Sequence, residues 1–369
     1  MAAQLLSTLA RLLFIGSLVL SVAAARPNPP CLIPKVRKEW RQLSKRERQD
    51  WIGAVNVCLG TLSHDPKLKP TVPTDVSLIP PVSTASSFYD DIAYIHMDLN
   101  FDIHYTGFFL PWHRYYVQFF EDSLVKKCGY KGAQPYWDWT IDAHDVYNAS
   151  IWDDSPSGLG RWGDPANDYQ IYSGGFKDQI RAYPSPHHIR RNYSLFPFAN
   201  SAFSGFMLNV TSFMPNSTMT RENVVHMVGG FDGDFIGFHS YFEGLSGSHA
   251  GAHLIVSGDM GGLCPYDREA PECYAGAKWT PNDPIFFLHH AMVDKLWYDW
   301  QNRLPMNKFA FGGGSVSAFG EFPAFFEFPT GAPPYLNFSS KIPGDGLWED
   351  VSIWDVMDTR AGALCYVYA

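Results

Sequence analysis

Six of the 13 histidines in this 369-residue chain stand at the spacing of metal ligands. They form two groups, which comprise His96, His104 and His113 in one part of the chain and His249, His253 and His290 in another. Three neutral imidazoles suit a copper, zinc or iron ion and leave coordination positions open for a small molecule. No Cys, Asp or Glu stands at a matching ligand position in either group. The pattern therefore favours copper and dioxygen chemistry over two-metal hydrolysis, in which bridging carboxylates are expected.

The first group requires two helices joined by a short connection. A serine at position 86 or 87 can cap a helix that runs through His96, and Pro111 suits the first turn of a helix over about 111–127. His104 then lies between these two helices.

The second group requires two further helices. His249 and His253, at i and i+4, share one face of a helix, as two ligands of one ion must. Asp283 and Pro284 are typical of the N-cap and first residue of a long helix, which places His290 in its second turn. Four helices that converge on two ions predict a mainly α fold, a four-helix bundle core holding a dinuclear metal site.

Other parts of the chain predict long loops and a few short strands. Residues 145–222 and 305–345 are rich in Gly, Pro, Asn and aromatic residues without a sustained period. Nearer the start, Ser44 and Glu47 form a capping-box pattern for a first helix that ends at about Leu59. No internal repeat or linker divides the chain, so we expect a single domain.

The first 25 residues are typical of a secretory signal peptide. Arg11 precedes an apolar run over 12–22, which is too short to span a membrane, and alanines at 23–25 suit cleavage. The mature domain is then 26–369, and we expect it to be extracellular, with no membrane attachment. Five glycosylation sequons agree with secretion, at Asn148, Asn192, Asn209, Asn216 and Asn337.

The six cysteines all lie after this leader, and an oxidising compartment permits three disulfides among them. Six cysteines allow fifteen connectivities. We expect Cys264 to pair with Cys273 around a Pro-containing loop, and Cys31 with Cys365 to join the two ends.

The composition describes an acidic globular protein. It is 46% hydrophobic and 18% charged, which suits a substantial core. The formal charge is −9, and it becomes −10 without the leader, whose one charged residue is Arg11. Such a chain is a poor nucleic-acid binder.

Two motifs around the histidines carry a family resemblance. They read His104-x4-Phe109-Leu110-Pro111-Trp112-His113-Arg114-x2-Val117-x3-Glu121 and Asp283-Pro284-x-Phe286-Phe287-x2-His290-x3-Asp294. The first resembles the first copper signature of the tyrosinase and catechol oxidase family, and the second resembles its second copper signature. Shorter matches extend the resemblance over nearly the whole chain, at Arg37–Arg41, Pro135–Trp139 and Tyr366–Tyr368. The chain is most similar to short secreted fungal forms without a C-terminal domain.

The resemblance implies two copper ions bound by the six histidines. It also implies an oxidase that uses dioxygen to convert o-diphenols to o-quinones, with o-aminophenols and, more weakly, monophenols as further substrates. A hemocyanin-like oxygen carrier with the same six ligands is an alternative, and a di-zinc protein is another. The oligomeric state stays open.

The family pattern also implies roles for residues beside the ligands. Many relatives place an Asn after the first ligand of the second copper, and with an upstream Glu it holds a water proposed to deprotonate monophenols. Here Ala250 follows His249, which favours diphenol oxidation over strong monophenol hydroxylation. Glu243 is the nearest carboxylate, as part of a proton relay or as a capping or surface residue. Leu263 lies near the position of a residue that gates substrate in relatives.

Two residues near the last ligand have open roles. His289 points about 100° away from His290 on a helix, so we expect it to support a ligand or line the pocket. Asp294 either orients a ligand imidazole or forms an ion pair, for which Arg114 is a candidate. The remaining histidines are expected to be structural, namely His64, His144, His187, His188, His226 and His239.

Overall fold

The computed structural model describes residues 30–71, 79–198, 212–267, 273, 275–321 and 323–369. The predicted signal peptide over 1–25 and the sequon at Asn209 lie outside these residues. Within the described part, helices dominate, and the strands pair only two at a time. No helix among the described residues has an apolar stretch long enough to cross a membrane.

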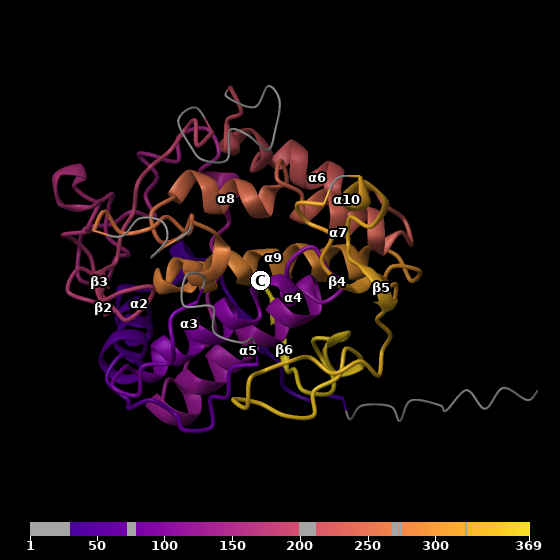
Figure 1. The fold of residues 1–369 in the computed structure, drawn as a ribbon, viewed down its shortest axis with the longest axis horizontal. Helices are drawn as coiled ribbons and strands as arrows, with labels where there is room; N and C mark the ends of the chain where they lie inside the picture. The colour runs from indigo at the N-terminus through magenta and orange to yellow at the C-terminus, as the bar shows by residue number, and fades with distance from the viewer. Residues whose placement is uncertain (1–29, 72–78, 199–211, 268–272, 274, 322) are drawn as a thin grey trace, which may run out of the picture.

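Four helices form the centre of the molecule. They are α3 (Phe88–Asp98), α5 (Phe109–Cys128), α8 (Ser248–Val256) and α9 (Ile285–Arg303). Figure 1 shows α9 crossing the middle of the view, with α8 above it and α3 and α5 below it. Helices α5 and α9 are packed against one another. The predicted mainly α fold with a helical bundle at its core is confirmed.

Local hydrogen bonds explain where these helices begin. The Ser87 hydroxyl accepts from the Asp90 backbone N–H, and the Asp90 carboxylate accepts from the Ser87 backbone N–H, so α3 opens with a capping box. At the start of α9, the Asp283 carboxylate accepts from the Ile285 backbone N–H. The capping box of Ser44 begins α2 (Lys45–Gly53), and the chain continues as a π-helix, η2 (Ala54–Leu59), to the predicted end.

Shorter elements cover the bundle. The remaining α-helices are α4 (Asn100–Ile103), α6 (Arg221–Gly229), α7 (Phe235–Glu243) and α10 (Ala324–Glu327). Short 3₁₀ segments are η1 (Trp40–Gln42), η3 (Trp139–Ile141), η4 (Pro165–Asn167), η6 (Pro215–Thr218), η7 (Ala277–Asn282) and η8 (Trp354–Val356). Two antiparallel pairs join β2 (Ile180–Arg181) to β3 (His187–His188) and β4 (Gly314–Val316) to β5 (Ala332–Tyr335). The long loops and few short strands agree with the prediction.

The two ends of the described chain lie together. Strands β1 (Lys35–Arg37) and β6 (Tyr366–Tyr368) pair in parallel, and a disulfide joins Cys31 to Cys365. The predicted disulfide between Cys264 and Cys273 is also formed. Both predicted pairs are therefore confirmed, and the third disulfide joins Cys58 of η2 to Cys128 at the end of α5.

A buried ion-pair cluster fixes this junction to the bundle. The Asp294 carboxylate on α9 accepts from the Arg114 guanidinium, from Arg37 at 3.3 Å, and from the hydroxyls of Tyr366 and Tyr368. Burial and the Asp294 charge raise the pKa of both tyrosines, so their hydroxyls stay protonated donors. Asp294 therefore forms the ion pair with Arg114 and links three segments of the fold.

Candidate metal centre

The predicted ligand histidines lie in two clusters at the centre of the bundle. In the first, nitrogen atoms of His96 (α3), His104 (the residue after α4) and His113 (α5) lie within 4.8 Å of one another. The second cluster meets the same limit and comprises His249 and His253 from α8 and His289 and His290 from α9. The structure thus brings together all six predicted ligands and adds His289.

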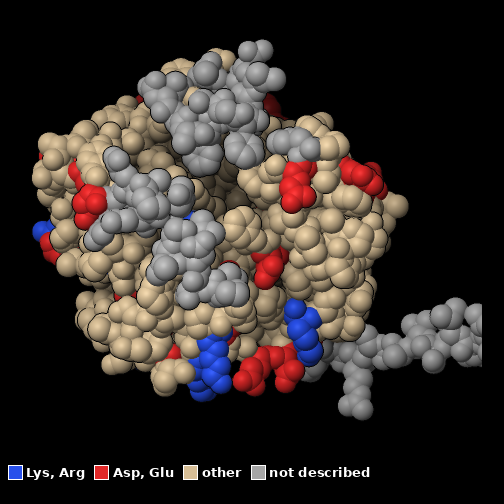
Figure 2. All heavy atoms as spheres, viewed as in Figure 1, with Lys and Arg blue, Asp and Glu red and all other residues tan. Residues whose placement is uncertain are grey.

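The two clusters face each other. The rings of His113 and His290 are stacked, with centroids 4.4 Å apart, and the rings of His104 and His249 are stacked at 6.3 Å. Both clusters are therefore parts of one centre. Figure 2, a space-filling view from the same side as Figure 1, shows a hollow in the surface near α8.

The first cluster has the hydrogen bonds that metal-bound imidazoles require. The Nδ1 atom of each ring lies at hydrogen-bond distance from a main-chain carbonyl; the acceptors for His96, His104 and His113 are Lys278, Asn100 and Phe109, at 2.8, 2.9 and 2.8 Å. A neutral ring that donates from Nδ1 has its lone pair on Nε2. The Nε2 atoms of His96 and His113 are buried and have no hydrogen-bond partner in the structure. A metal ion would satisfy them.

The second cluster also offers free lone pairs. His253 donates from Nδ1 to the Met260 carbonyl at 2.7 Å, so its lone pair is on Nε2. That atom lies 3.3 Å from Nε2 of His290. Both ring nitrogens of His249 are buried and have no hydrogen-bond partner in the structure. Three imidazoles thus converge from α8 and α9.

A tryptophan distinguishes His289 from its neighbour His290. The Trp139 indole N–H lies 3.2 Å from Nδ1 of His289 and can only donate. Neutral His289 then has its proton on Nε2 and offers no lone pair to an ion on that side. Two sets of three imidazoles therefore fit this geometry, and His289 packs against the rings of His249 and His253.

Burial keeps the imidazoles uncharged. Loss of solvent places the pKa values of His96, His113, His249 and His290 well below their ordinary value. The same effect lowers the pKa of His253 to about 4. The rings are thus neutral at neutral pH, the form that binds a metal.

Aromatic side chains shield the centre. The Phe286 ring lies 4.1 Å from the ring of His290 and 5.1 Å from that of His96, between centroids. Phe286 is fully buried.

Glu243 is buried beside the first cluster. One oxygen of its carboxylate accepts from the Tyr105 backbone N–H at 2.7 Å, and the other lies 2.8 Å from Nε2 of His239. Tyr105 directly follows His104 and has a φ of 54°, in the left-handed region. Glu243 is therefore neither a capping nor a surface residue, because it holds the chain next to His104.

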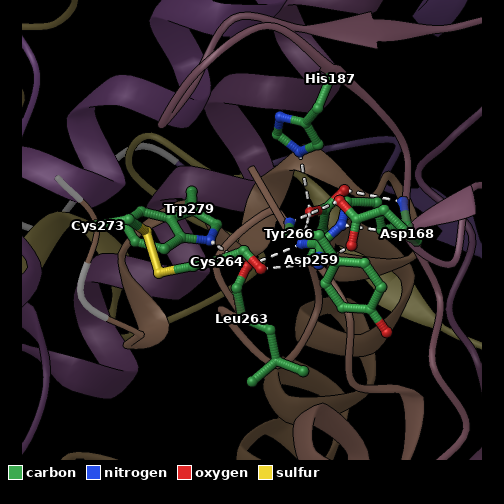
Figure 3. The surroundings of a disulfide bond; sticks show 9 residues. Asp168, His187, Asp259, Leu263, Cys264, Tyr266, Cys273 and Trp279 are labelled. Atoms are coloured by element: carbon green, nitrogen blue, oxygen red, sulfur yellow. Dashed lines mark hydrogen bonds and ion pairs between the residues drawn. A yellow bond between two sulfur atoms is a disulfide. The ribbon is translucent and has the colours of Figure 1, made fainter. Parts of the chain in front are cut away.

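The two other predicted pocket residues are half-buried. Ala250 follows His249 in α8. Leu263 lies in the loop after α8, and its carbonyl accepts from the Trp279 indole N–H at 3.3 Å (Figure 3). Its side chain points away from the polar groups around Asp259 in that view.

Two contacts of the centre were absent from the sequence analysis. His239 is buried, lies 2.8 Å from a carboxylate oxygen of Glu243 and stacks on Phe109, with ring centroids 5.3 Å apart, contacts that agree with a structural role. The i, i+4 spacing of His239 and Glu243 on α7 is a signal that could have indicated this pair. Trp139 is 150 residues from His289, and no local pattern joins them.

Comparison with known proteins agrees with this geometry. A family model described as the common central domain of tyrosinase matches residues 86–303. The tyrosinase-like protein phomQ1' of Diaporthe leptostromiformis is 32% identical over 361 residues, which cover 95% of this chain and 84% of the relative. Tyrosinase ustQ of Aspergillus flavus is 28% identical over 350 residues, covering 92% of this chain and 81% of the relative.

A solved structure shows the same fold. A polyphenol oxidase variant from Thermothelomyces thermophila superposes with a TM-score of 0.60 at 23% identity, covering 91% of this chain and 89% of that one. An all-imidazole donor set without carboxylates suits copper, and the free Nε2 atoms fit two ions. With the family match over the bundle, these features place the chain in the tyrosinase family, as a phenol oxidase with a type 3 dinuclear copper centre.

Proposed function

We propose that this protein oxidises o-diphenols to o-quinones with dioxygen as the oxidant. The observation that carries the proposal is the pair of facing imidazole clusters. Four of their six predicted ligands have Nδ1 at a main-chain carbonyl, and buried ring nitrogens in both clusters have no hydrogen-bond partner in the structure. O-aminophenols would react in the same way, because they also lose two electrons and two protons. Monophenols would react more weakly.

Each copper ion would be held by three Nε2 atoms. The first triad is His96, His104 and His113, and the second is His249, His253 and His290. Bound copper would supply the electron transfer between the phenol and dioxygen. Each of two diphenol molecules gives up two electrons and two protons. One dioxygen molecule takes up these four electrons and four protons and becomes two waters.

The residues beside the second triad favour diphenols. Ala250 has no hydrogen-bonding side chain, so it cannot hold a water next to His249 for the deprotonation of a monophenol. A diphenol is easier to oxidise and has less need of that base. The two carboxylate oxygens of Glu243 contact the Tyr105 backbone N–H and the His239 ring, so the proposed relay residue is held beside His104. Leu263 would contact the substrate from the loop after α8.

We also propose that the protein is secreted as one catalytic domain over 26–369. The leader over 1–25, the sequons and three disulfides with no free cysteine support this, because disulfides persist in oxidising compartments. N-terminal sequencing of protein recovered from culture medium tests it, and a start near residue 26 is expected.

Oxygen uptake by the copper-loaded protein tests the proposed reaction. With catechol we expect immediate uptake, and with tyrosine at the same concentration we expect slow uptake or none. Prompt uptake with both substrates would contradict the inference from Ala250. No uptake with either, together with reversible oxygen binding or a preference for zinc, would contradict the oxidase itself.

A further inference from the structure

The buried guanidinium of Arg190 joins two other segments of the chain, one at Asp168 and one over 259–264. Its Nε donates to the Asp168 carbonyl at 3.2 Å; one Nη donates to the Asp259 carboxylate at 3.4 Å and to the Leu263 carbonyl at 2.9 Å. The other Nη donates to the Asp168 carboxylate at 2.8 Å and to the Cys264 carbonyl at 2.9 Å. All five N–H groups of the guanidinium thus have acceptors, and Arg190 is 2% exposed. Figure 3 shows these acceptors around one point.

Asp259 strengthens the same junction. Its carboxylate accepts from the Arg190 backbone N–H at 3.0 Å and lies 3.0 Å from Nε2 of His187. Its own backbone N–H donates to the Arg190 carbonyl at 3.0 Å. Arg190 and Asp259 are therefore linked through both main chains and both side chains, in a fully buried place.

The loop 257–264, which these contacts fix, has little freedom to move. Ser257 and Gly258 have φ values of 51° and 56°, and a Cβ on Gly258 would lie 2.3 Å from the Arg190 carbonyl oxygen. A disulfide from Cys264 to Cys273 restrains the far end of the loop. The contacts of this loop with Arg190 therefore hold its backbone in the observed path.

A backbone carbonyl of this loop accepts a hydrogen bond from one proposed copper ligand. Met260 is fully buried in it, and its carbonyl accepts from Nδ1 of His253 at 2.7 Å. That hydrogen bond orients the ring so that Nε2 lies 3.3 Å from Nε2 of His290. His253 is a half-buried residue, whereas His249 and His290 are buried, and the Met260 carbonyl is the hydrogen-bond partner of its Nδ1.

We propose that Arg190 is a positioning residue for the second copper ion, acting through the loop 257–264 and the Met260 carbonyl on His253. The same contacts fix the backbone of Leu263, the proposed substrate contact. This inference rests on the proposed function, because it takes His253 to be a copper ligand. Arg190 itself does not contact the centre.

The substitution Arg190→Lys tests the proposal. Arg190→Lys keeps the positive charge beside Asp259, but an ammonium has three donors at one point and cannot reach both carbonyls of the loop. We expect a chelator to remove one copper ion about tenfold faster from this variant than from the wild type, and the other ion at the wild-type rate. Electron paramagnetic resonance would count the protein molecules left with a single Cu(II).

The control separates positioning from general loosening. Val55→Ala removes methyl groups from a fully buried position on η2, away from the loop, and can be compared with Arg190→Lys by melting temperature. Faster loss of one ion in Arg190→Lys alone supports the proposal. The proposal is overturned if the chelator removes both ions equally faster from both variants. It is also overturned if the chelator removes both ions from Arg190→Lys at the wild-type rates.

A milder variant decides the question where Arg190→Lys does not fold. His187→Leu removes one hydrogen-bond partner of Asp259, and we expect the chelator to remove the same copper ion faster than from the wild type, by less than in Arg190→Lys. A wild-type rate of copper loss in His187→Leu would then overturn the proposal. A wild-type protein that takes up fewer than two copper ions would instead contradict the proposed function, so the two failures are distinguishable.

Discussion

The two halves of the copper centre are held in different ways. In the first cluster, every Nδ1 atom has a carbonyl partner, and two of these partners lie four residues earlier, Asn100 for His104 and Phe109 for His113. In the second cluster, His253 has such a partner, whereas Nδ1 of His249 and of His290 has none in the structure. Local geometry thus orients two of the three rings of the first cluster, whereas the second cluster depends on a loop and on packing.

This difference has a consequence for metal binding. A ligand whose ring is already oriented loses less freedom when the ion binds. We therefore expect the first copper ion to be held more tightly than the second.

Removal of a ligand should have the largest effect. His113→Ala and His253→Ala should each lower the rate of catechol oxidation by more than about a hundredfold. Loss of a residue that only supports a ligand usually costs about a hundredfold at most. Metal analysis should find one copper ion in each variant. A variant that keeps two ions and most of its activity would exclude that histidine as a ligand.

Acid should destabilise the metal-free protein, because the folded state keeps buried rings such as that of His253 neutral. The unfolded chain protonates its histidines near pH 6.5, whereas the folded chain holds the pKa of His253 at about 4. The unfolded state therefore binds more protons as the pH falls below 6.5, and this side chain alone should cost about 3 kcal/mol of unfolding free energy by pH 4. Denaturant titrations at pH 7.5, 6 and 5 measure the trend.

The matched control for this pH dependence is His253→Phe. It should lose part of the dependence between pH 7 and 5 while the rest, from the other buried imidazoles, persists. An unfolding free energy of the metal-free wild type that does not change over this range would contradict the neutral, buried state of the clusters.

The neighbouring pair His289 and His290 should behave differently. His289→Phe should keep both copper ions and lose activity by about tenfold or less, since it acts only through packing and Trp139. His290→Phe should lose the second ion. The reverse pattern in metal analysis would exchange their roles.

The smallest expected effect is on substrate choice. Ala250→Asn adds an amide next to His249, and one net hydrogen bond of about 1 kcal/mol corresponds to about fivefold in rate. We expect the ratio of monophenol to diphenol oxidation to rise by that factor, with Ala250→Leu as a control of similar volume. An unchanged ratio in Ala250→Asn would show that this position does not govern monophenol oxidation.

The sequence predicted those parts of the molecule that depend on local patterns. The capping residues Ser44 and Ser87 begin helices as expected, and the i, i+4 pair His249 and His253 shares one helix. The disulfides at Cys31 and Cys264 were also predicted, one from the ends of the chain and one from a short loop.

Long-range contacts could not be predicted in the same way. The Trp139 N–H that distinguishes His289 from His290 comes from a segment 150 residues earlier, and the Lys278 carbonyl behind His96 is 182 residues away. The same holds for Asp294, whose partners come from both ends of the chain. A one-dimensional pattern does not encode which remote backbone group faces a given ring.

The central claim is that three imidazoles bind each copper ion and that His289 is not among them. Anomalous diffraction at the copper edge, from crystals of the copper-loaded protein, tests it most directly. We expect two copper peaks, each at about 2.0 Å from three imidazole nitrogens, a usual metal–imidazole distance. A single peak, or a peak bound by His289 in place of His290, would contradict the account.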